Sequence, residues 1–347
     1  MNKNLVIVIS FIAIIGSTFC SENPDSNTLG NTEFYVASWN LENLFDTVDD
    51  YDKIDEWYLP ESDINWTNEK LEKKLQNLTK VFTLMNSGKG PDILGVQEVE
   101  HKELLEMLLK KISINKNYQI VHYESPDKRG IDNAIIFNSD IFSLKHSEAI
   151  KIDLGGEKTT RDIIYGVLEN NNSDYHVFVN HWPSRREGLK KSEPNRIKAA
   201  ETVRNKIENL ANTESKNIII LGDFNDLPSN LSISEILKAQ KFICDSTVTN
   251  NNLFYNITYA DFQKGKGTYK FRDHWNMLDQ IIISKSLLDG NGMDYKCDSF
   301  EILKPDFIIQ QTGKYKGTSL PTYGGRKYLG GYSDHFAIGA KFIKVKN

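Results

Sequence analysis

The stretch that most constrains the fold runs from Asn217 to Pro228 and reads N-I-I-I-L-G-D-F-N-D-L-P. Within it, Ile218 to Leu221 form a short, continuous apolar run that ends at Gly222. An apolar run of this length, closed by a glycine, predicts a strand that is buried on both faces. We expect the rest of the chain to be organised around this strand.

Three polar residues follow the predicted strand: Asp223, Asn225 and Asp226. A rigid strand that ends in carboxylates can support a reactive group, and loops at such positions often carry catalytic residues. Asp and Asn are also common turn residues. The stretch alone supports both interpretations equally. Asp226 is predicted to be a turn residue ahead of Pro228.

The first twenty residues are predicted to be a signal peptide and not part of the fold. Lys3 supplies the positive start, and the apolar segment from Leu5 to Ile15 is too short for a comfortable transmembrane helix. Two interpretations of its end stay open: ordinary cleavage near this point, or a lipoprotein signal in which Cys20 becomes the lipidated first residue. We expect an exported bacterial protein, either secreted or held in the envelope through lipidated Cys20.

Residues 21–31 are polar and are predicted to form a flexible tether, followed by one domain over residues 32–345. Hydrophobic residues make up 39% of the chain, which supports a sizeable core. The formal net charge of −5 gives no overall attraction for polyanions, so nucleic-acid binding must depend on local basic clusters. Cys244 and Cys297 could form a disulfide, which the sequence alone does not show. We expect a monomer.

The domain mixes many short strands with a few helices. Strands are predicted at 34–39, 93–96, 118–123, 134–137, 163–168, 175–179, 218–221, 280–283 and 336–343. Helices are predicted at 67–86, 104–112, from Pro194 to about 210, and at 232–240, and residues 44–66 are predicted to be a surface loop. This mixture, without an internal repeat or a clear linker, indicates two sheets packed together with helices outside.

Polar residues recur where the predicted strands begin or end. They are Asn40, Glu98, Asp132, Asn180 with His181, Asp223 with Asn225, Asp279, and Asp334 with His335. Each by itself is more often a cap, a turn residue or a structural histidine. Together they supply hard oxygen ligands and two imidazoles, a set that suits a magnesium-dependent phosphoester hydrolase. No Cys/His pair has the spacing of a structural zinc site.

With their neighbours, these residues form motifs that resemble those of the endonuclease/exonuclease/phosphatase superfamily, which has the DNase-I-like fold. The motifs are W-N at 39–40, Q-E at 97–98, N-H-W-P-S-R at 180–185, G-D-F-N at 222–225, L-D-Q-I at 278–281 and S-D-H at 333–335. They come in the family's order over residues 34–343. The resemblance implies a four-layer α/β/β/α sandwich of two mainly antiparallel sheets, with the site at one end of the sheets.

The resemblance also implies a metal site. Glu98 resembles the principal ligand, with Asn40 beside it and Asp334 close to the same ion, which would be Mg²⁺, with Mn²⁺ or Ca²⁺ as alternatives. Asp223 would orient or deprotonate the attacking water, helped by Asn225.

Two histidines complete the implied site. His335 would bind the scissile phosphate or carry a proton, with Asp279 holding its ring through the other nitrogen. His181 resembles the second histidine of the deoxyribonuclease-type members and would be the acid for the leaving oxygen. Asp132 occupies the place in the sequence where an acidic partner of His181 would be expected.

Basic residues cluster beside these motifs and are predicted to bind substrate phosphates. They are Arg185 and Arg186 after His181, and Lys270 and Arg272 before Asp279, the latter interleaved with aromatic residues. The long H-W-P-S-R motif and the ending Y-L-G-G-Y-S-D-H resemble an exported, endonuclease-like bacterial branch of the superfamily.

We therefore expect an exported endonuclease with little sequence preference, acting on DNA or RNA. Two alternatives remain at this point. One is a phosphatase or lipid phosphodiesterase, similar to inositol-phosphate phosphatases or sphingomyelinases, because the superfamily's catalytic core does not separate these activities. The other is a non-catalytic module that keeps the fold and binds a partner.

Overall fold

The structure is a computed structural model that describes residues 32–210, 216–244 and 254–345. The predicted signal peptide and tether, including Cys20, lie outside the described residues. Within the described segments, no helix combines the length and the apolar character that crossing a membrane would require.

The first sheet contains seven strands in the order β14-β18-β1-β2-β4-β3, with β15 also paired to β18. Its strands are β1 (Glu33–Leu44), β2 (Ile93–Val99), β3 (Tyr118–His122), β4 (Asp132–Asn138), β14 (Met293–Tyr295), β15 (Glu301–Ile302) and β18 (Ile338–Lys344). Its neighbouring strands are antiparallel, except that β1 and β2 run parallel.

The second sheet also contains seven strands, in the order β5-β6-β7-β8-β13-β10-β9. Its strands are β5 (Ser143–Ile150), β6 (Ile163–Asn170), β7 (Ser173–His181), β8 (Asn217–Asp223), β9 (Ala239–Lys241), β10 (Phe254–Asn256) and β13 (Asp279–Ser284). The pairs β7–β8 and β9–β10 are parallel, and the others are antiparallel.

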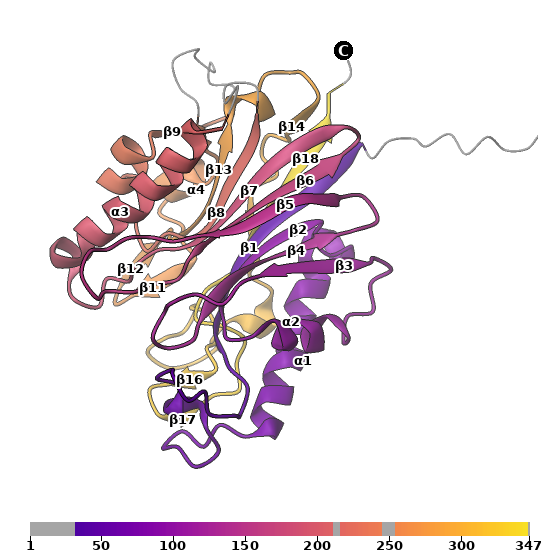
Figure 1. Ribbon diagram of the computed structural model, residues 1–347. Helices are drawn as coiled ribbons and strands as arrows, with labels where there is room; N and C mark the ends of the chain where they lie inside the picture. Colours follow the sequence, from indigo (N-terminus) through magenta and orange to yellow (C-terminus); the bar gives the residue numbers. More distant parts are fainter. Residues whose placement is uncertain (1–31, 211–215, 245–253, 346–347) are drawn as a thin grey trace, which may run out of the picture. The chain divides into compact units, whose positions relative to one another are not determined.

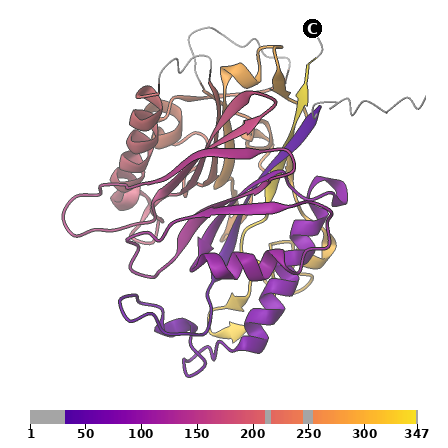
Figure 2. The same cartoon turned by 45° about the vertical axis from the view of Figure 1, so that its right-hand side comes forward.

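Helices cover the outer face of each sheet, as Figures 1 and 2 show. Helices α1 (Asn68–Gly88) and α2 (Lys102–Leu109) pack on the first sheet, and α3 (Leu189–Glu208) packs on the second. A third apolar cluster fills the space between the two sheets. The predicted four-layer α/β/β/α sandwich of two mainly antiparallel sheets is confirmed, with one parallel pair in the first sheet and two in the second.

Shorter elements complete the chain. They are η1 (Glu56–Tyr58), η3 (Ser232–Ile236), α4 (Tyr259–Gln263), η4 (Lys285–Leu287), η5 (Asp306–Ile308), the hairpin of β11 (Tyr269–Phe271) and β12 (His274–Asn276), and the hairpin of β16 (Tyr323–Gly324) and β17 (Lys327–Tyr328).

Strand β8 shows why its apolar run is continuous. Ile218 and Ile220 pack with residues of α3, whereas Ile219 and Leu221 pack in the cluster between the sheets. Successive side chains of a strand point to opposite faces, so a strand that is covered on both sides has no solvent-facing position. All four side chains are fully buried, which confirms the predicted doubly buried strand.

Three local predictions were wrong. Helix α3 begins at Leu189 and contains Pro194, which had been predicted to start it. The helix predicted at 232–240 is a five-residue π-helical turn, η3, followed by β9, because short apolar runs do not distinguish helix from strand. The segment predicted to be a surface loop buries Phe45 and Trp66 in the core beneath α1.

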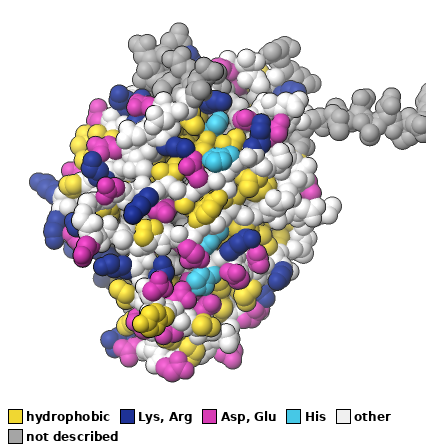
Figure 3. Space-filling model, in the orientation of Figure 1, with side chains coloured by type: hydrophobic (Ala, Val, Ile, Leu, Met, Phe, Trp, Pro, Cys, Tyr) yellow, Lys and Arg dark blue, Asp and Glu magenta, His cyan; other side chains and the backbone are white. Residues whose placement is uncertain are grey.

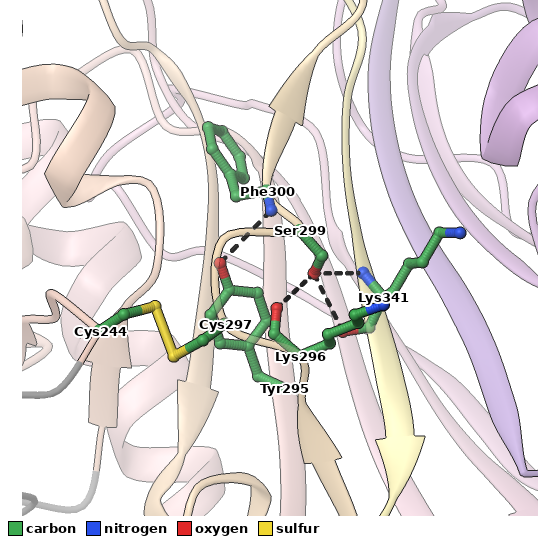
Figure 4. Close-up of a disulfide and its surroundings, with 7 residues drawn as sticks. All are labelled: Cys244, Tyr295, Lys296, Cys297, Ser299, Phe300 and Lys341. Carbon is green, nitrogen blue, oxygen red and sulfur yellow. Dashed lines mark hydrogen bonds between the residues drawn. A yellow bond between two sulfur atoms is a disulfide. The ribbon is translucent and has the colours of Figure 1, made fainter.

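A disulfide between Cys244 and Cys297 joins the two sheets at one edge (Figure 4). Cys244 follows β9 of the second sheet and Cys297 follows β14 of the first, and their Cα atoms are 5.6 Å apart. The loop of Cys297 is anchored by Ser299, whose hydroxyl accepts a hydrogen bond from the Lys341 amide at 3.0 Å. The bridge closes a separation of 53 residues, so it restricts the unfolded chain considerably.

Candidate active site

One row of polar residues lies where β7 and β8 end and the antiparallel neighbour β13 begins. His181 of β7 pairs with Asp223 of β8, and Asp223 pairs with Asp279 of β13. Residues paired across strands lie about 5 Å apart. Gly222, with φ of 134°, permits this close approach, because a Cβ at that position would lie 2.0 Å from the carbonyl oxygen of Asn180.

The first sheet brings its own polar residues to the same end. Asn40 lies on β1, Glu98 lies at a bulge in β2 with φ of 63°, and Asp334 and His335 precede β18. A positive φ is costly for a residue with a Cβ and is typical of functional positions. Residues from both sheets line a single cavity of about 830 Å³, among them Glu98, His181, Asp223, Asn225, Asp334 and His335.

Asp223 lies at the centre of this arrangement and is 1% exposed. One carboxylate oxygen accepts the backbone N–H of Asn225 at 2.9 Å, and the other accepts the amide of Asn40 at 3.1 Å. Burial raises the pKa of Asp223 to about 6, partly offset by the charge of His335. Both Asn40 and Asn225 therefore orient Asp223. The side-chain amide of Asn225 donates to the Trp182 carbonyl at 2.9 Å.

His335 is held by a short hydrogen bond between its Nδ1 and Oδ2 of Asp279, at 2.7 Å. The other nitrogen, Nε2, faces Asp223 at 3.9 Å. Burial by itself would lower the pKa of His335, but the charges of Asp279, Asp223 and Asp334 raise it well above its usual value. His335 is therefore protonated at neutral pH. The structure places Asp279 in the position that the sequence predicted for it, against the ring of this histidine.

His181 has different surroundings. Its Nε2 lies 3.8 Å from Oε1 of Glu98 and 3.7 Å from Oδ2 of Asp223. Its Nδ1 is buried without a hydrogen-bond partner among the residues that the structure describes. Burial lowers the pKa of His181 well below its usual value, and the positive charges of Arg161, Arg129 and His335 lower it further. In this structure His181 is therefore a neutral imidazole.

The predicted acidic partner of His181 lies elsewhere, which corrects that pairing. Asp132 accepts a hydrogen bond from the Ser125 backbone N–H at 2.8 Å and faces His122 at 3.5 Å. It forms no ion pair with His181 and does not line the cavity. The first residue of β4 lies beside Val99 of β2, and its side chain turns into the β3–β4 connection.

The carboxylates of Glu98 and Asp334 are the donors best suited to a divalent cation. Burial, with the nearby charges of Glu42 and Glu98, raises the pKa of Asp334 to about 7. One oxygen of Glu98 accepts the backbone N–H of Asn43 at 2.9 Å. Such a concentration of carboxylates fits a hard cation, because a cation offsets their mutual repulsion. Asn40 is less suited to the ligand role that the sequence predicted, since its side chain is committed to Asp223 and to the Glu42 backbone.

A buried lysine supports this part of the site and was not predicted. Lys74 of α1 is 1% exposed and donates to the Tyr332 carbonyl and the Thr322 hydroxyl, each at 2.7 Å. It also lies 3.5 Å from a carboxylate oxygen of Glu42. Burial lowers its pKa, and Glu42 and Asp334 oppose that shift. The sequence around Lys74 is typical of an ordinary amphipathic helix, so it does not indicate that this lysine is buried beside the site.

Four arginines line the cavity: Arg129, Arg161, Arg185 and Arg186. The prediction named the last two but not Arg129 or Arg161. Arg161 is 5% exposed, lies 3.2 Å from Asp127 and donates to the Trp182 carbonyl at 2.8 Å. These contacts span regions distant in sequence, so sequence proximity to the motifs could not reveal them.

The predicted phosphate-binding residues divide into two groups. Arg185 and Arg186 both line the cavity, and Arg185 also contacts the carbonyl oxygen of Asn225 at 2.5 Å and Asp226 at 3.3 Å, so it braces the loop after β8. Lys270 and Arg272 do not line it; they lie over the rings of Trp275 and Phe271 on the β11–β12 hairpin.

Asp226 lies in a bend ahead of Pro228, as predicted, and the structure adds contacts that the sequence did not indicate. It is 1% exposed and forms an ion pair of 2.7 Å with fully buried Arg196 of α3. It also accepts the hydroxyl of Ser232 at 2.6 Å. Asp226 therefore fixes the catalytic loop to the outer helix layer.

A sequence profile described as "Endonuclease/Exonuclease/phosphatase family" matches residues 35–345. The chain belongs to this family, and it is accordingly a hydrolase of the phosphoesterase class. The family predicted from the motifs is confirmed. Members of this family generally use divalent metals. A search of curated protein sequences finds no match to this chain.

Solved structures share the fold over nearly the whole chain. Humanized D. rerio TDP2 with 14 mutations is 15% identical, with a TM-score of 0.56, over 90% of this chain and 99% of that one. The human Nocturnin catalytic domain is 19% identical, with a TM-score of 0.57, over 91% and 95%. The Bacteroides thetaiotaomicron mannosyl-6-phosphatase Bt3783 is 16% identical, with a TM-score of 0.54, over 89% and 99%. At these identities the likeness shows the fold alone.

Proposed function

We propose that this protein is a divalent-metal-dependent phosphodiesterase that acts as an endonuclease on DNA or RNA with little sequence preference. The observation that carries this proposal is the composition of the cavity. It combines a histidine–aspartate pair and a cluster of carboxylates with four arginines at the end of the two sheets. Carboxylates can bind a cation or act as a base, and arginines can bind phosphate.

The basic lining extends beyond the catalytic residues, which favours a polymer with successive phosphates. A neighbouring pocket of about 550 Å³ shares Arg129, Arg161 and Arg186 with the cavity and adds Lys128 and Lys158. The net charge is −5, and acidic and basic side chains are interspersed over the face in Figure 3, so the attraction must be local.

Two aromatic residues and one relative add support for a nucleic acid. Tyr269 and Phe271 line the cavity, where bases could stack on them. A structure of similar fold, D. rerio TDP2, is described in complex with a single-strand DNA product. The similarity to a mannosyl-6-phosphatase keeps a phosphatase as the competing activity.

In this proposal Asp223 is the base that orients and deprotonates the attacking water. Its pKa of about 6 leaves the carboxylate mostly ionised at pH 7, yet basic enough to accept a proton. Asn40 and Asn225 fix its two oxygens, so the accepting lone pairs are preorganised. Protonated His335, held by Asp279, offsets the negative charge that develops on the phosphate.

His181 is assigned as the acid that protonates the leaving oxygen, and its surroundings add one condition to this role. It is neutral in this structure, so it donates a hydrogen bond rather than a full proton until a phosphodiester binds. The negative charge of the substrate beside His181 favours its protonated form. Substrate binding would therefore favour the uptake of a proton from solvent by His181, which then donates it to the leaving oxygen.

Glu98 and Asp334 would hold the divalent cation, with Mg²⁺ as the first choice and Mn²⁺ or Ca²⁺ as alternatives. A cation bound there would polarise the phosphoryl oxygen and offset the charge of the transition state. The chain's own contribution is to orient Glu98 through the Asn43 N–H and to keep the surrounding carboxylates in place through Lys74.

We also propose that the protein works outside the cytoplasm, as a monomer. The Cys244–Cys297 disulfide supports this location, because disulfides persist mainly in oxidising compartments. Attachment through lipidated Cys20 would leave the domain free to reach extracellular nucleic acid. Labelling cells with a fatty-acid analogue distinguishes the two forms: label on the wild type but not on Cys20→Ser shows lipidation, and no label shows ordinary secretion.

Plasmid nicking tests the proposed activity. The purified protein is incubated with supercoiled DNA, or with RNA, in Mg²⁺, with and without EDTA. We expect nicked DNA or shortened RNA in Mg²⁺ and none in EDTA. The Glu98→Gln variant should lose the reaction, while Glu103→Gln, an exposed carboxylate of α2 outside both pockets, serves as a matched control.

Sugar phosphates and phosphocholine lipids are assayed in parallel. Release of phosphate or phosphocholine without any cleavage of nucleic acid would overturn the endonuclease proposal in favour of a phosphatase or lipid phosphodiesterase. Inactivity on every substrate would favour the non-catalytic module.

A further inference from the structure

A second group of possible metal ligands lies where β3 ends and β4 begins. His122, Glu124 and Asp132 each offer one ligand atom, and these three atoms lie within 4.8 Å of one another. None of the three residues lines the catalytic cavity. The strand pairing brings them together, because His122 pairs with Ala134, two residues beyond Asp132.

Two buried atoms of this group face each other without a hydrogen bond. The side chains of His122 and Asp132 are 4% and 1% exposed, and Nε2 of His122 lies 3.5 Å from Oδ2 of Asp132. Neither atom has a hydrogen-bond partner in the parts of the chain that the structure describes, apart from an interaction between the carboxyl groups of Asp132 and Glu124. Such orphaned atoms are rare in folded proteins, because each is costly to bury. A ligand between them would satisfy both.

Neighbouring residues hold Asp132 and Glu124 in place. The Ser125 backbone N–H donates to Oδ1 of Asp132 at 2.8 Å, which leaves Oδ2 directed at His122. Oε1 of Glu124 lies 3.2 Å from Nδ1 of His101 and 3.9 Å from Nδ1 of His122, and His101 also lies 3.2 Å from Asp50 through Nε2. Metal ligands are commonly oriented by outer hydrogen bonds of this kind.

We propose that His122, Glu124 and Asp132 form a second metal site that binds a divalent ion of the Zn²⁺ class. Two ligand atoms on a tetrahedral Zn²⁺ are about 3.4 Å apart, given metal–ligand distances near 2.0–2.1 Å. The 3.5 Å between His122 and Asp132 matches this separation. An imidazole with two carboxylates favours Zn²⁺ over Mg²⁺, which prefers oxygen ligands and its own waters. A water would complete the set.

This site has a structural consequence for the cavity. The segment between Glu124 and Asp132 carries Asp127 and Arg129, and both line the catalytic cavity. An ion bound by residues at both ends of this segment would hold those ends together and so fix the position of the cavity wall. The sequence has no Cys/His zinc spacing, and a site with one histidine and two carboxylates leaves no such pattern.

Zinc titration by calorimetry tests the proposal. Protein without a histidine tag is saturated with Mg²⁺, so that the catalytic carboxylates are occupied, and Zn²⁺ is then added. We expect one equivalent of Zn²⁺ to bind the wild type. The His122→Ala variant should bind at least about tenfold more weakly. His146→Ala is the matched control, because exposed His146 also lies beside a carboxylate, Glu148.

Absence of Zn²⁺ binding by the Mg²⁺-saturated wild type would overturn the proposal, as would wild-type affinity in a folded His122→Ala variant. Anomalous diffraction from a Zn²⁺-soaked crystal of the wild type decides the question without any variant. The expected peak lies between His122 and Asp132. A peak only at Glu98 and Asp334, or only beside Glu100, would contradict it.

Discussion

The two histidines of the cavity have the same chemistry and opposite surroundings. His335 has a carboxylate at 2.7 Å on its Nδ1 and is charged, whereas the Nδ1 of His181 has no hydrogen-bond partner among the described residues and its ring lies near arginines. The comparison shows that the neighbours of a histidine decide its charge and hence its role. In this structure one ring carries a positive charge and the other does not.

The largest expected effect follows from removing either ring. His335→Asn and His181→Asn should each lower kcat on plasmid DNA on the order of 10²–10⁴-fold. Asparagine keeps a hydrogen-bond donor, so Asp279 retains a partner and the fold is preserved. Rates are measured with circular dichroism as the check on folding. Near-normal turnover in either folded variant would remove that histidine from the mechanism, and His274→Asn, on the exposed hairpin, is the control.

Asp279, the carboxylate partner of His335, is expected to affect the rate by orienting the ring and stabilising its charged form. Asp279→Asn should lower kcat on the order of tenfold to 10²-fold, because the ring loses part of its orientation. The raised pKa of His335 means that the protonated form is present below that pKa and is lost as pH rises through it. Without the Asp279 charge this loss should occur at lower pH. An alkaline limb of the pH–rate profile that does not move would show that His335 does not act in its charged form.

The surroundings of His181 should matter more for stability than for rate. Arg161→Leu removes the partner of buried Asp127 and the donor to the Trp182 carbonyl. Leaving a buried charge unpaired should lower the free energy of unfolding by about 3 kcal/mol, measured by urea denaturation. Asp127→Asn with Arg161→Leu should recover part of this loss. If the single variant is as stable as wild type, Arg161 does not hold this wall of the cavity.

The smallest expected effect concerns substrate affinity. Arg186→Ala should raise KM for DNA and reduce the salt dependence by about one counterion, because Arg186 lines the cavity. Lys270→Ala should leave that dependence unchanged, since Lys270 lies on the hairpin and outside the lining. The log–log slope of kcat/KM against salt measures both. Equal slopes for the two variants would contradict the division of the predicted phosphate-binding residues.

Much of the catalytic row was predictable because each member sits at a strand boundary next to a recognisable motif. The apolar run before Asp223 and the His335 motif before the last strand carry local signals. Lys74 and Arg161 carry none, because their partners lie in segments far away in the sequence. Strand β5 was missed for a related reason: it is an edge strand with mostly exposed or half-buried residues, so its sequence shows no buried face.

The sequence by itself determined the family, the two-sheet sandwich with outer helices, and the residue types at the ends of the central strands. Those properties are local, since strand periodicity and short motifs are read from neighbouring residues. The tertiary structure decided which side chains the buried polar residues contact. Asp132 turns away from His181 toward His122, and Asp226 pairs with Arg196. The direction of a buried side chain depends on packing against distant segments, and the charge of a buried histidine depends on those same neighbours.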